Sequence, residues 1–96
     1  DWVIPASDAA RAVGRVALVS GRLTRTYDGA GAFYLNFGED WRTDFSVKVT
    51  GKTRRTLAPV LAGLKPGTRV EMRGFITQEN GPMLVLTTPY HLEVTP

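Results

Sequence analysis

The chain has 96 residues, enough for one small domain, because two separate cores within this length would each be too small to fold. It contains no cysteine and a single histidine, His91, which excludes disulfide bonds, thiolate metal sites and a zinc centre built from histidines. No apolar run approaches the roughly 18 residues that span a bilayer, so we expect no membrane partner. Twelve lysines and arginines against nine aspartates and glutamates give a net charge of +3, a mildly basic balance found in phosphate-binding domains and in many other proteins.

The N-terminal residues carry no regular hydrophobic pattern. Within residues 1–13, Ser7 or Asp8 can cap one short helical turn. We therefore predict a lead-in over residues 1–13 and one domain over residues 14–96. The chain begins at Asp1 rather than at methionine, as a trimmed precursor or a part of a longer protein does, and the sequence does not fix the compartment.

Two-residue alternation of apolar side chains begins at Gly14. The stretch GRVALVSGRLTRT places Val16 and Leu18 on one side, which predicts a long first strand. Gly21 in its interior predicts a bulge or sharp bend, where the strand passes from one half of a barrel to the other. Residues 27–31 predict a flexible loop.

A hairpin follows, and each of its arms has one apolar face and one polar face. Alternation predicts strands over residues 33–37 and 44–49, joined by a turn over residues 38–41. The side chains expected to point inward are those of Phe33, Leu35, Phe37, Phe45, Val47 and Val49. The side chains expected to point outward are those of Tyr34, Asn36, Asp44, Ser46 and Lys48.

The spacing becomes helical over residues 52–64, with Thr53 as a candidate cap. Pro59 lies inside this stretch, so we expect a helix that is short, is kinked or begins near that residue. Alternation resumes over residues 68–77. After that come a predicted turn at Asn80-Gly81-Pro82 and a final strand, over residues 83–87 and 90–94, which Pro89 interrupts.

Three strands, one short helix and two further strands, with a glycine inside the first strand, are the element order of the oligonucleotide/oligosaccharide-binding fold, or OB-fold. We therefore predict an all-β domain with one short α-helix: a five-stranded OB-fold Greek-key barrel with the helix between strands three and four. An SH3-like barrel has strands of similar length but would leave the apolar side chains of residues 57–64 without a place to pack.

The sequence also resembles an accessory OB-like domain of bacterial proteins in the staphylococcal-nuclease-like, or thermonuclease, family. The resemblance covers residues 14–94 and is carried by Leu35-Asn36-Phe37-Gly38, Asp40-Trp41-Arg42, Asp44-Phe45, Arg73-Gly74 and Asn80-Gly81-Pro82. It implies a bacterial, nucleic-acid-linked context, with export as one expectation. It does not imply that this domain itself cleaves a substrate.

The outward face of the first three strands is the candidate binding surface, because OB-folds stack bases on aromatic rings there while basic side chains follow the phosphates. The nucleic-acid-binding residues that we predict are Arg22, Arg25, Tyr27, Tyr34, Asn36, Lys48, Arg73 and Asn80. Each has an ordinary alternative, since an outward tyrosine is often a cross-strand packing partner and arginines are often solvated surface charges.

The turn over residues 39–44 offers a catalytic alternative. Glu39, Asp40 and Asp44 are residue types that hold a divalent cation, and Arg42 is of the type that stabilises charge on a phosphoryl group. Acidic turn residues more commonly accept backbone N–H bonds, in which case Asp40 or Asp44 pairs with Arg42 and Trp41 folds over the barrel end.

We predict a non-catalytic module that binds single-stranded DNA or RNA weakly, with no metal and no cofactor. Two alternatives stay open: a structural barrel that contacts a protein partner or a second copy of itself, and, with less support, a metal-dependent phosphodiesterase. The fold does not decide among them, because one barrel can carry unrelated activities.

Overall fold

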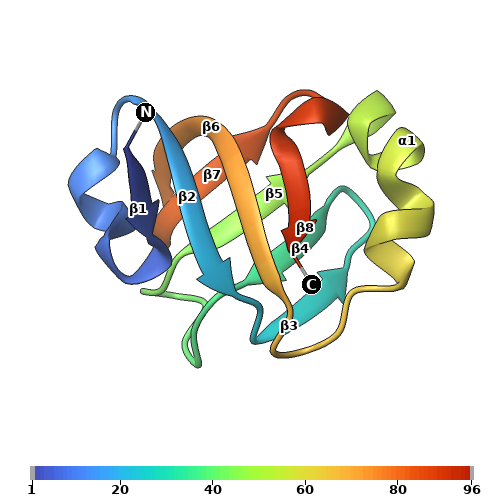
Figure 1. The fold of residues 1–96 in the computed structure, drawn as a ribbon, viewed down its shortest axis with the longest axis horizontal. Helices are drawn as coiled ribbons and strands as arrows, with labels where there is room; N and C mark the ends of the chain where they lie inside the picture. The colour runs from blue at the N-terminus through green and yellow to red at the C-terminus, as the bar shows by residue number, and fades with distance from the viewer. Residues whose placement is uncertain (1, 96) are drawn as a thin grey trace.

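The computed structural model describes residues 2–95, which form one mixed β-sheet of eight strands, one α-helix and two short 3₁₀ helices (Figure 1). The strands are β1 (Val3–Pro5), β2 (Val16–Arg22), β3 (Arg25–Asp28), β4 (Phe33–Asn36), β5 (Ser46–Val49), β6 (Arg69–Glu79), β7 (Gly81–Leu86) and β8 (Leu92–Thr95). The helices are η1 (Ala6–Ala12), α1 (Gly51–Ala62) and η2 (Pro89–His91).

The strands follow one another across the sheet in the order β1-β2-β6-β7-β5-β4-β3, and β8 pairs with β6. The β1–β2 and β5–β7 pairs are parallel, and the others are antiparallel. The sheet is not closed by a ladder between its two ends, β1 and β3. Figure 1 shows α1 at one end of the strands and η1 at the opposite end.

The apolar faces of the central strands lie where the alternation predicts. In β4 and β5, Leu35, Val47 and Val49 are fully buried, whereas Tyr34 and Lys48 are only partly covered. The same holds in β6, whose buried residues are Val70, Met72, Gly74 and Ile76. These side chains form one core with residues of β2, β7 and α1, so the outward face of β3, β4 and β5 is left available for other contacts.

The first strand divides at Leu23 and Thr24 rather than at Gly21. The Leu23 amide donates to the carbonyl of Thr68, the residue just before β6, at 2.8 Å. The Thr24 amide donates instead to the Asn36 carbonyl of β4, also at 2.8 Å. The prediction of the bend was therefore wrong by two residues, because the change of hydrogen-bonding partner sets its position.

Two further boundaries differ from the prediction. Tyr27 belongs to β3 rather than to a loop, because the strand continues to Asp28 in register with Phe33. Asp44 precedes β5 instead of lying on it, and its carboxylate accepts a hydrogen bond from the Asp40 amide within the turn. Both changes alter which side chains face the candidate surface.

Helix α1 begins at Gly51, with Thr50 at the N-cap position and no side-chain cap. Thr53 was wrongly predicted as the cap, and it is buried within the first turn. The helix continues through Pro59, because Leu57 and Leu61 on either side of it are both buried in the core and this packing holds the backbone despite the lost hydrogen bond.

The predicted lead-in contains more structure than one helical turn. Residues 3–5 form β1, and η1 begins at Ala6 with Pro5 at its N-cap position. No side chain caps η1, so the prediction of Ser7 or Asp8 as a cap was wrong.

The N-terminal segment packs closely against the sheet. Ala9 and Ala12 of η1 are buried in the common core. A Cβ atom on Gly21 would lie 2.8 Å from the Cβ of Ala6, so the approach of η1 to β2 requires glycine at this position.

The C-terminal region follows the predicted interruption at Pro89. The turn between β6 and β7 consists of Asn80 alone. Its φ is 68°, a left-handed conformation that asparagine adopts more readily than most residues. After β7, Thr88 accepts a hydrogen bond from the Tyr90 amide and starts η2, so the last strand is a separate β8 paired with β6. No helix among residues 2–95 is long and apolar enough to cross a membrane.

Candidate functional site

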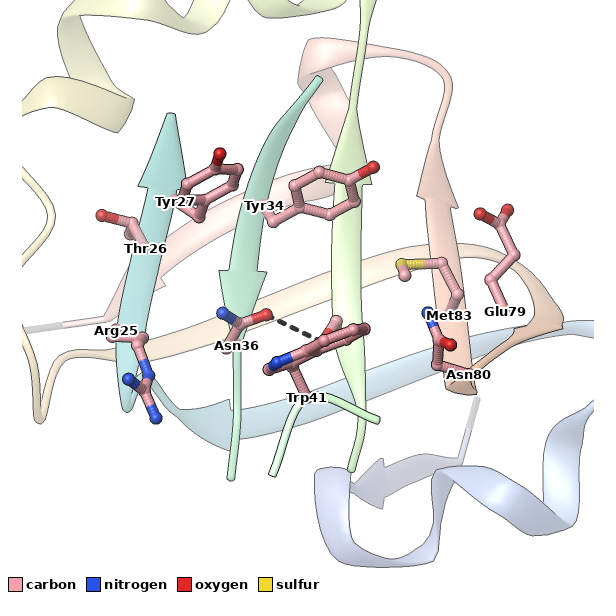
Figure 2. Close-up of a pocket in the computed structure, with 10 residues that line it drawn as sticks. Arg25, Thr26, Tyr27, Tyr34, Asn36, Trp41, Glu79, Asn80 and Met83 are labelled. Carbon is pink, nitrogen blue, oxygen red and sulfur yellow. Dashed lines mark hydrogen bonds between the residues drawn. The ribbon is translucent and has the colours of Figure 1, made fainter. Parts of the chain in front are cut away.

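A cavity of about 450 Å³ opens on the outward face of β3, β4, β5 and β7 (Figure 2). Its lining residues are Arg25, Thr26, Tyr27, Tyr34, Asn36, Trp41, Ser46, Glu79, Asn80 and Met83. Cavities that bind small ligands usually have volumes of about 300 to 1,000 Å³, so this one has room for a ligand of nucleotide size.

Three aromatic side chains border the cavity. Tyr27 and Tyr34 are opposite each other in the β3–β4 ladder, and their rings stack with centroids 6.3 Å apart and planes at 29°. Trp41 comes from the turn between β4 and β5 and is 56% exposed. Figure 2 shows it projecting toward the same region as the two tyrosines. Exposed rings on one face offer stacking surfaces, which is the means by which OB-folds hold unpaired bases.

The floor of the cavity is polar at β4 and β5 and apolar at β7. The Ser46 hydroxyl donates to Oδ1 of Asn36 at 2.9 Å, and the two residues are 3% and 9% exposed. Met83 stands opposite Ser46 in the parallel β5–β7 ladder and is also buried. Strand pairing fixes the backbone positions from which these three side chains reach the floor.

Charged groups at the rim are largely engaged. Arg25 donates from its guanidinium to the Glu39 carbonyl at 3.2 Å, which holds the β3 side of the cavity against the turn that carries Trp41. Lys48 lies beside Tyr34 on β5, and its Nζ is 3.3 Å from Oε1 of Glu79. The site thus has hydrogen-bond donors and two cations, Arg25 and Lys48, and the Glu79 carboxylate offsets part of their positive charge.

The acidic turn is built from hydrogen bonds among its own residues. Oδ1 of Asp40 accepts from the Arg42 amide at 3.0 Å and from the Arg42 Nε at 3.1 Å, and these bonds, the backbone one first, lower the pKa of Asp40 below its ordinary value. The carboxylate of Asp44 accepts from the Asp40 amide at 3.0 Å and from the Thr43 hydroxyl at 3.4 Å. Within residues 2–95 no three carboxylate, histidine or cysteine side chains are placed to share a metal ion.

The cavity brings together five of the eight predicted binding residues, namely Arg25, Tyr27, Tyr34, Asn36 and Asn80. Lys48 adjoins it through the ion pair with Glu79. Arg22 lies elsewhere, at the end of β2, where it donates to the Gly67 carbonyl at 3.2 Å. Arg73 lines a separate hollow of about 190 Å³ on the outer side of β2 and β6.

Five lining residues were absent from the predicted binding set: Thr26, Trp41, Ser46, Glu79 and Met83. Of these, Ser46 was predicted only to point outward on its strand. Trp41 carried a signal, a large aromatic side chain in a polar turn, but the sequence indicates only that it covers an end of the barrel. Met83 and Glu79 carried none, because they reach the site through the pairing of β7 with β5 and β6, which local pattern does not determine.

The fold and this cavity define an OB-like β domain with an aromatic-lined cavity on one face of its sheet. The described chain superposes on a putative aspartyl-tRNA synthetase from Leishmania major Friedlin with a TM-score of 0.73 and 10% identity, covering 97% of this chain and 20% of the synthetase. It is similar to an OBody bound to hen egg-white lysozyme (TM-score 0.65, 17% identity), covering 88% of this chain and 85% of the OBody chain. It is also similar to a chain of the S. pombe Stn1-Ten1 complex (TM-score 0.66, 14% identity), covering 83% of this chain and 57% of the other.

These likenesses establish an OB-like fold, because identities this low relate folds and not activities. The chain spans about a fifth of the synthetase. No protein-family model and no curated protein matches the sequence.

Proposed function

We propose that this protein is a non-catalytic module that binds single-stranded nucleic acid in the cavity on β3, β4, β5 and β7. The observation that carries the proposal is the set of three rings, Tyr27, Tyr34 and Trp41, around a cavity whose floor and rim hold hydrogen-bonding groups. An unpaired base has two apolar faces, which can stack on the rings, and a polar edge, which can form hydrogen bonds with the floor and rim. The fold relation to a protein named as a tRNA synthetase supports a nucleic-acid ligand.

The binding that we propose is weak and sensitive to salt. Each base stacked on an aromatic ring contributes about 1 to 3 kcal/mol, and the cavity offers three rings, two of which already stack on each other. Arg25 and Lys48 are the cations at the site that can approach phosphates, and Lys48 is partly neutralised by Glu79. Stacking therefore supplies more of the affinity than charge does.

We also infer that β2 and β3 together form the first strand of a five-stranded barrel, with β4, β5, β6 and β7 as the other four. The hydrogen bonds of Leu23 and Thr24 to opposite neighbours support this inference. In this arrangement α1 lies between strands three and four, and β1, η1 and β8 are additions outside the barrel. The division of the chain at residue 13 stays a prediction.

A titration tests the proposed function. A fluorescent strand of about eight nucleotides, within the usual range for one OB-fold, is added to the protein at low salt and followed by anisotropy. We expect Tyr34→Ala and Trp41→Ala to raise the Kd about fivefold or more, the equivalent of about 1 kcal/mol per lost stack.

Tyr90→Ala is the matched control, because Tyr90 is 91% exposed on η2 and lies outside the cavity. The proposal fails if the unmodified protein does not bind at low salt. It also fails if Tyr90→Ala weakens binding as much as Tyr34→Ala does.

A protein contact is the second candidate, favoured by a separate apolar surface. Val16 and Phe75 face each other across the β2–β6 ladder with 59% and 49% of their surfaces exposed. Trp2, which is 88% exposed, lines the same hollow as Val16. Exposed apolar groups of this size, when contiguous, often mark interaction surfaces. Sedimentation equilibrium tests self-association: this candidate predicts concentration-dependent dimers that Phe75→Ser disrupts, whereas a monomer at all concentrations counts against a second copy as the partner.

A further inference from the structure

The outward face of β2 and β6 carries a second surface, which shares no lining residue with the cavity. Val16 stands opposite Phe75 in the antiparallel ladder, and Leu18 stands opposite Arg73. Residues two apart on a strand point to the same face, so these four side chains form one patch. Val3 of β1 stands opposite Leu18 in the parallel β1–β2 ladder and extends the patch by one strand.

The apolar part of this patch is open to solvent, because Val3, Val16 and Phe75 each keep about half of their surface exposed. Beside it is the hollow of about 190 Å³, whose lining also includes Trp2, Ile4, Ala12, Arg15 and Ala17. Cavities for small ligands usually have volumes from about 300 Å³ upward, so this hollow suits a side chain of a partner better than a whole small molecule. The patch and the hollow together are called the β2–β6 surface.

The charge on the β2–β6 surface is positive. The described residues that line the hollow include two arginines, Arg15 and Arg73, and no carboxylate. Arg11 lies close by, because its carbonyl accepts a hydrogen bond from the Arg15 guanidinium at 3.3 Å. Glu71, the next outward side chain of β6, stands opposite Ser20 and outside the hollow. The surface therefore combines exposed apolar groups with an excess of positive charge.

Two other occupants fit this chemistry less well. In a two-fold dimer the same patch meets itself, which brings the arginines of two copies into one interface, where like charges weaken association. A single-stranded nucleic acid would attract the arginines, but bases stack on aromatic rings. The hollow is lined largely by aliphatic side chains, among them Ile4, Val16 and Leu18, which pack better against apolar side chains of a protein.

We propose that the β2–β6 surface binds an acidic segment of another protein, in which leucine or phenylalanine alternates with aspartate or glutamate. The apolar side chains of that segment cover Val16 and Phe75 and enter the hollow, and its carboxylates approach Arg11 and Arg15. Arginine and aromatic side chains, both present here, are enriched at protein interfaces. This site does not depend on the proposed binding of single strands, and the protein can hold both ligands at once.

The test uses a short fluorescent peptide of this composition, followed by anisotropy at low salt, and a second peptide in which lysine replaces every acidic residue. We expect the acidic peptide to bind and the lysine peptide to bind about tenfold more weakly or not at all. Arg15→Gln should raise the Kd of the acidic peptide about two- to fivefold, the range for an exposed ion pair. Val16→Ser should raise it about fivefold or more, because an apolar contact is lost.

Arg55→Gln and Val94→Ser are the matched controls. Arg55 is exposed on α1, Val94 is 39% exposed on β8, and neither lines the hollow. Each control repeats the chemical change of its counterpart away from the β2–β6 surface, so the Kd of the acidic peptide should stay unchanged. Circular dichroism establishes that each variant is folded.

Titration of the single strand separates this inference from the proposed function. We expect Val16→Ser to leave the Kd of the strand unchanged, and Arg15→Gln to alter it no more than Arg55→Gln does. Tyr34→Ala, which lies in the cavity, should leave the Kd of the acidic peptide unchanged. A protein that binds the peptide but no strand would overturn the proposed function and leave this inference standing.

The inference is overturned if the acidic peptide does not bind, if the lysine peptide binds equally well, or if Arg15→Gln and Val16→Ser behave as their controls do. It is also overturned if those two variants weaken strand binding as much as peptide binding, since the surface would then bind nucleic acid. Concentration-dependent dimers that Phe75→Ser disrupts would make a second copy of this chain the occupant instead.

Discussion

Among single residues, Gly81 fixes the turn that carries Trp41 against the sheet. A Cβ atom at this position would lie 2.5 Å from the Asp44 carbonyl oxygen and 2.5 Å from the Thr43 carbonyl carbon. Both contacts are with backbone atoms, which cannot move aside as a flexible side chain can. The absence of a side chain at Gly81 therefore lets the turn lie close to β7, and with it the ring of Trp41 at the cavity.

We predict that Gly81→Ala destabilises the fold by about 1 to 3 kcal/mol, the usual cost of forcing extra atoms into a packed region, and weakens binding of a single strand. Gly31→Ala is the matched control, because nothing lies within 4 Å of its added Cβ. That change should leave stability unchanged or raise it by up to about 1 kcal/mol, because alanine restricts the conformations of the unfolded chain. Urea unfolding measures both, and equal destabilisation by the two variants would contradict the packing role of Gly81.

Among the elements, helix α1 contains an internal conflict between sequence and structure. Pro59 has no N–H to donate to the carbonyl four residues earlier, yet the helix runs from Gly51 to Ala62. Pro59 itself is exposed. Burial of Leu57 and Leu61 compensates for the lost hydrogen bond, so the helix forms because of its tertiary contacts and in spite of its local preference.

Replacing Pro59 with alanine should therefore stabilise the protein. The restored hydrogen bond and the relief of the ring clash are together worth about 3 kcal/mol, and the greater freedom of the unfolded chain removes up to about 1 kcal/mol, leaving a net gain of about 2 kcal/mol. Pro66→Ala, outside the helix, should lower stability by up to about 1 kcal/mol. A lower midpoint of thermal unfolding for Pro59→Ala would show that the proline is accommodated without cost.

The elements also show what the sequence can and cannot predict. Alternation located the buried faces of β4, β5 and β6 correctly, because a two-residue period directly reflects one buried face. It misplaced Tyr27 in a loop and Asp44 on a strand, since strand ends depend on the partner strand: Tyr27 is held by Tyr34, and Asp44 by the turn. From the same alternation the candidate surface was predicted on the outward face of the first three strands, and β3, β4 and β5 do border the cavity. Met83 was missed because the parallel pairing of β7 with β5 joins segments far apart in the chain.

For the whole molecule, the distribution of charge matters more than its total. The net charge is +3, yet several basic side chains form ion pairs: Lys48 with Glu79, Arg42 with Asp40, and Arg54 with Asp28. Arg54 also donates to the Gly29 carbonyl at 2.7 Å and so holds α1 to the loop between β3 and β4. Most of these positive charges therefore maintain the fold around the site, and the long-range attraction of a polyanion is modest.

Releasing Lys48 from its ion pair should convert a structural charge into a binding one. In Glu79→Gln the ammonium group of Lys48, beside Tyr34, becomes free to contact a phosphate. We expect affinity for a single strand at low salt to rise about two- to fivefold, the range for an exposed ion pair. The slope of log K against log salt should become steeper by about 0.7, the value for one added phosphate contact on a single strand. Glu93→Gln makes the same change of net charge on exposed β8, outside the cavity, and should leave the slope unchanged. If both variants steepened the slope equally, net charge alone would govern binding, and the position of Lys48 beside the cavity would make no difference.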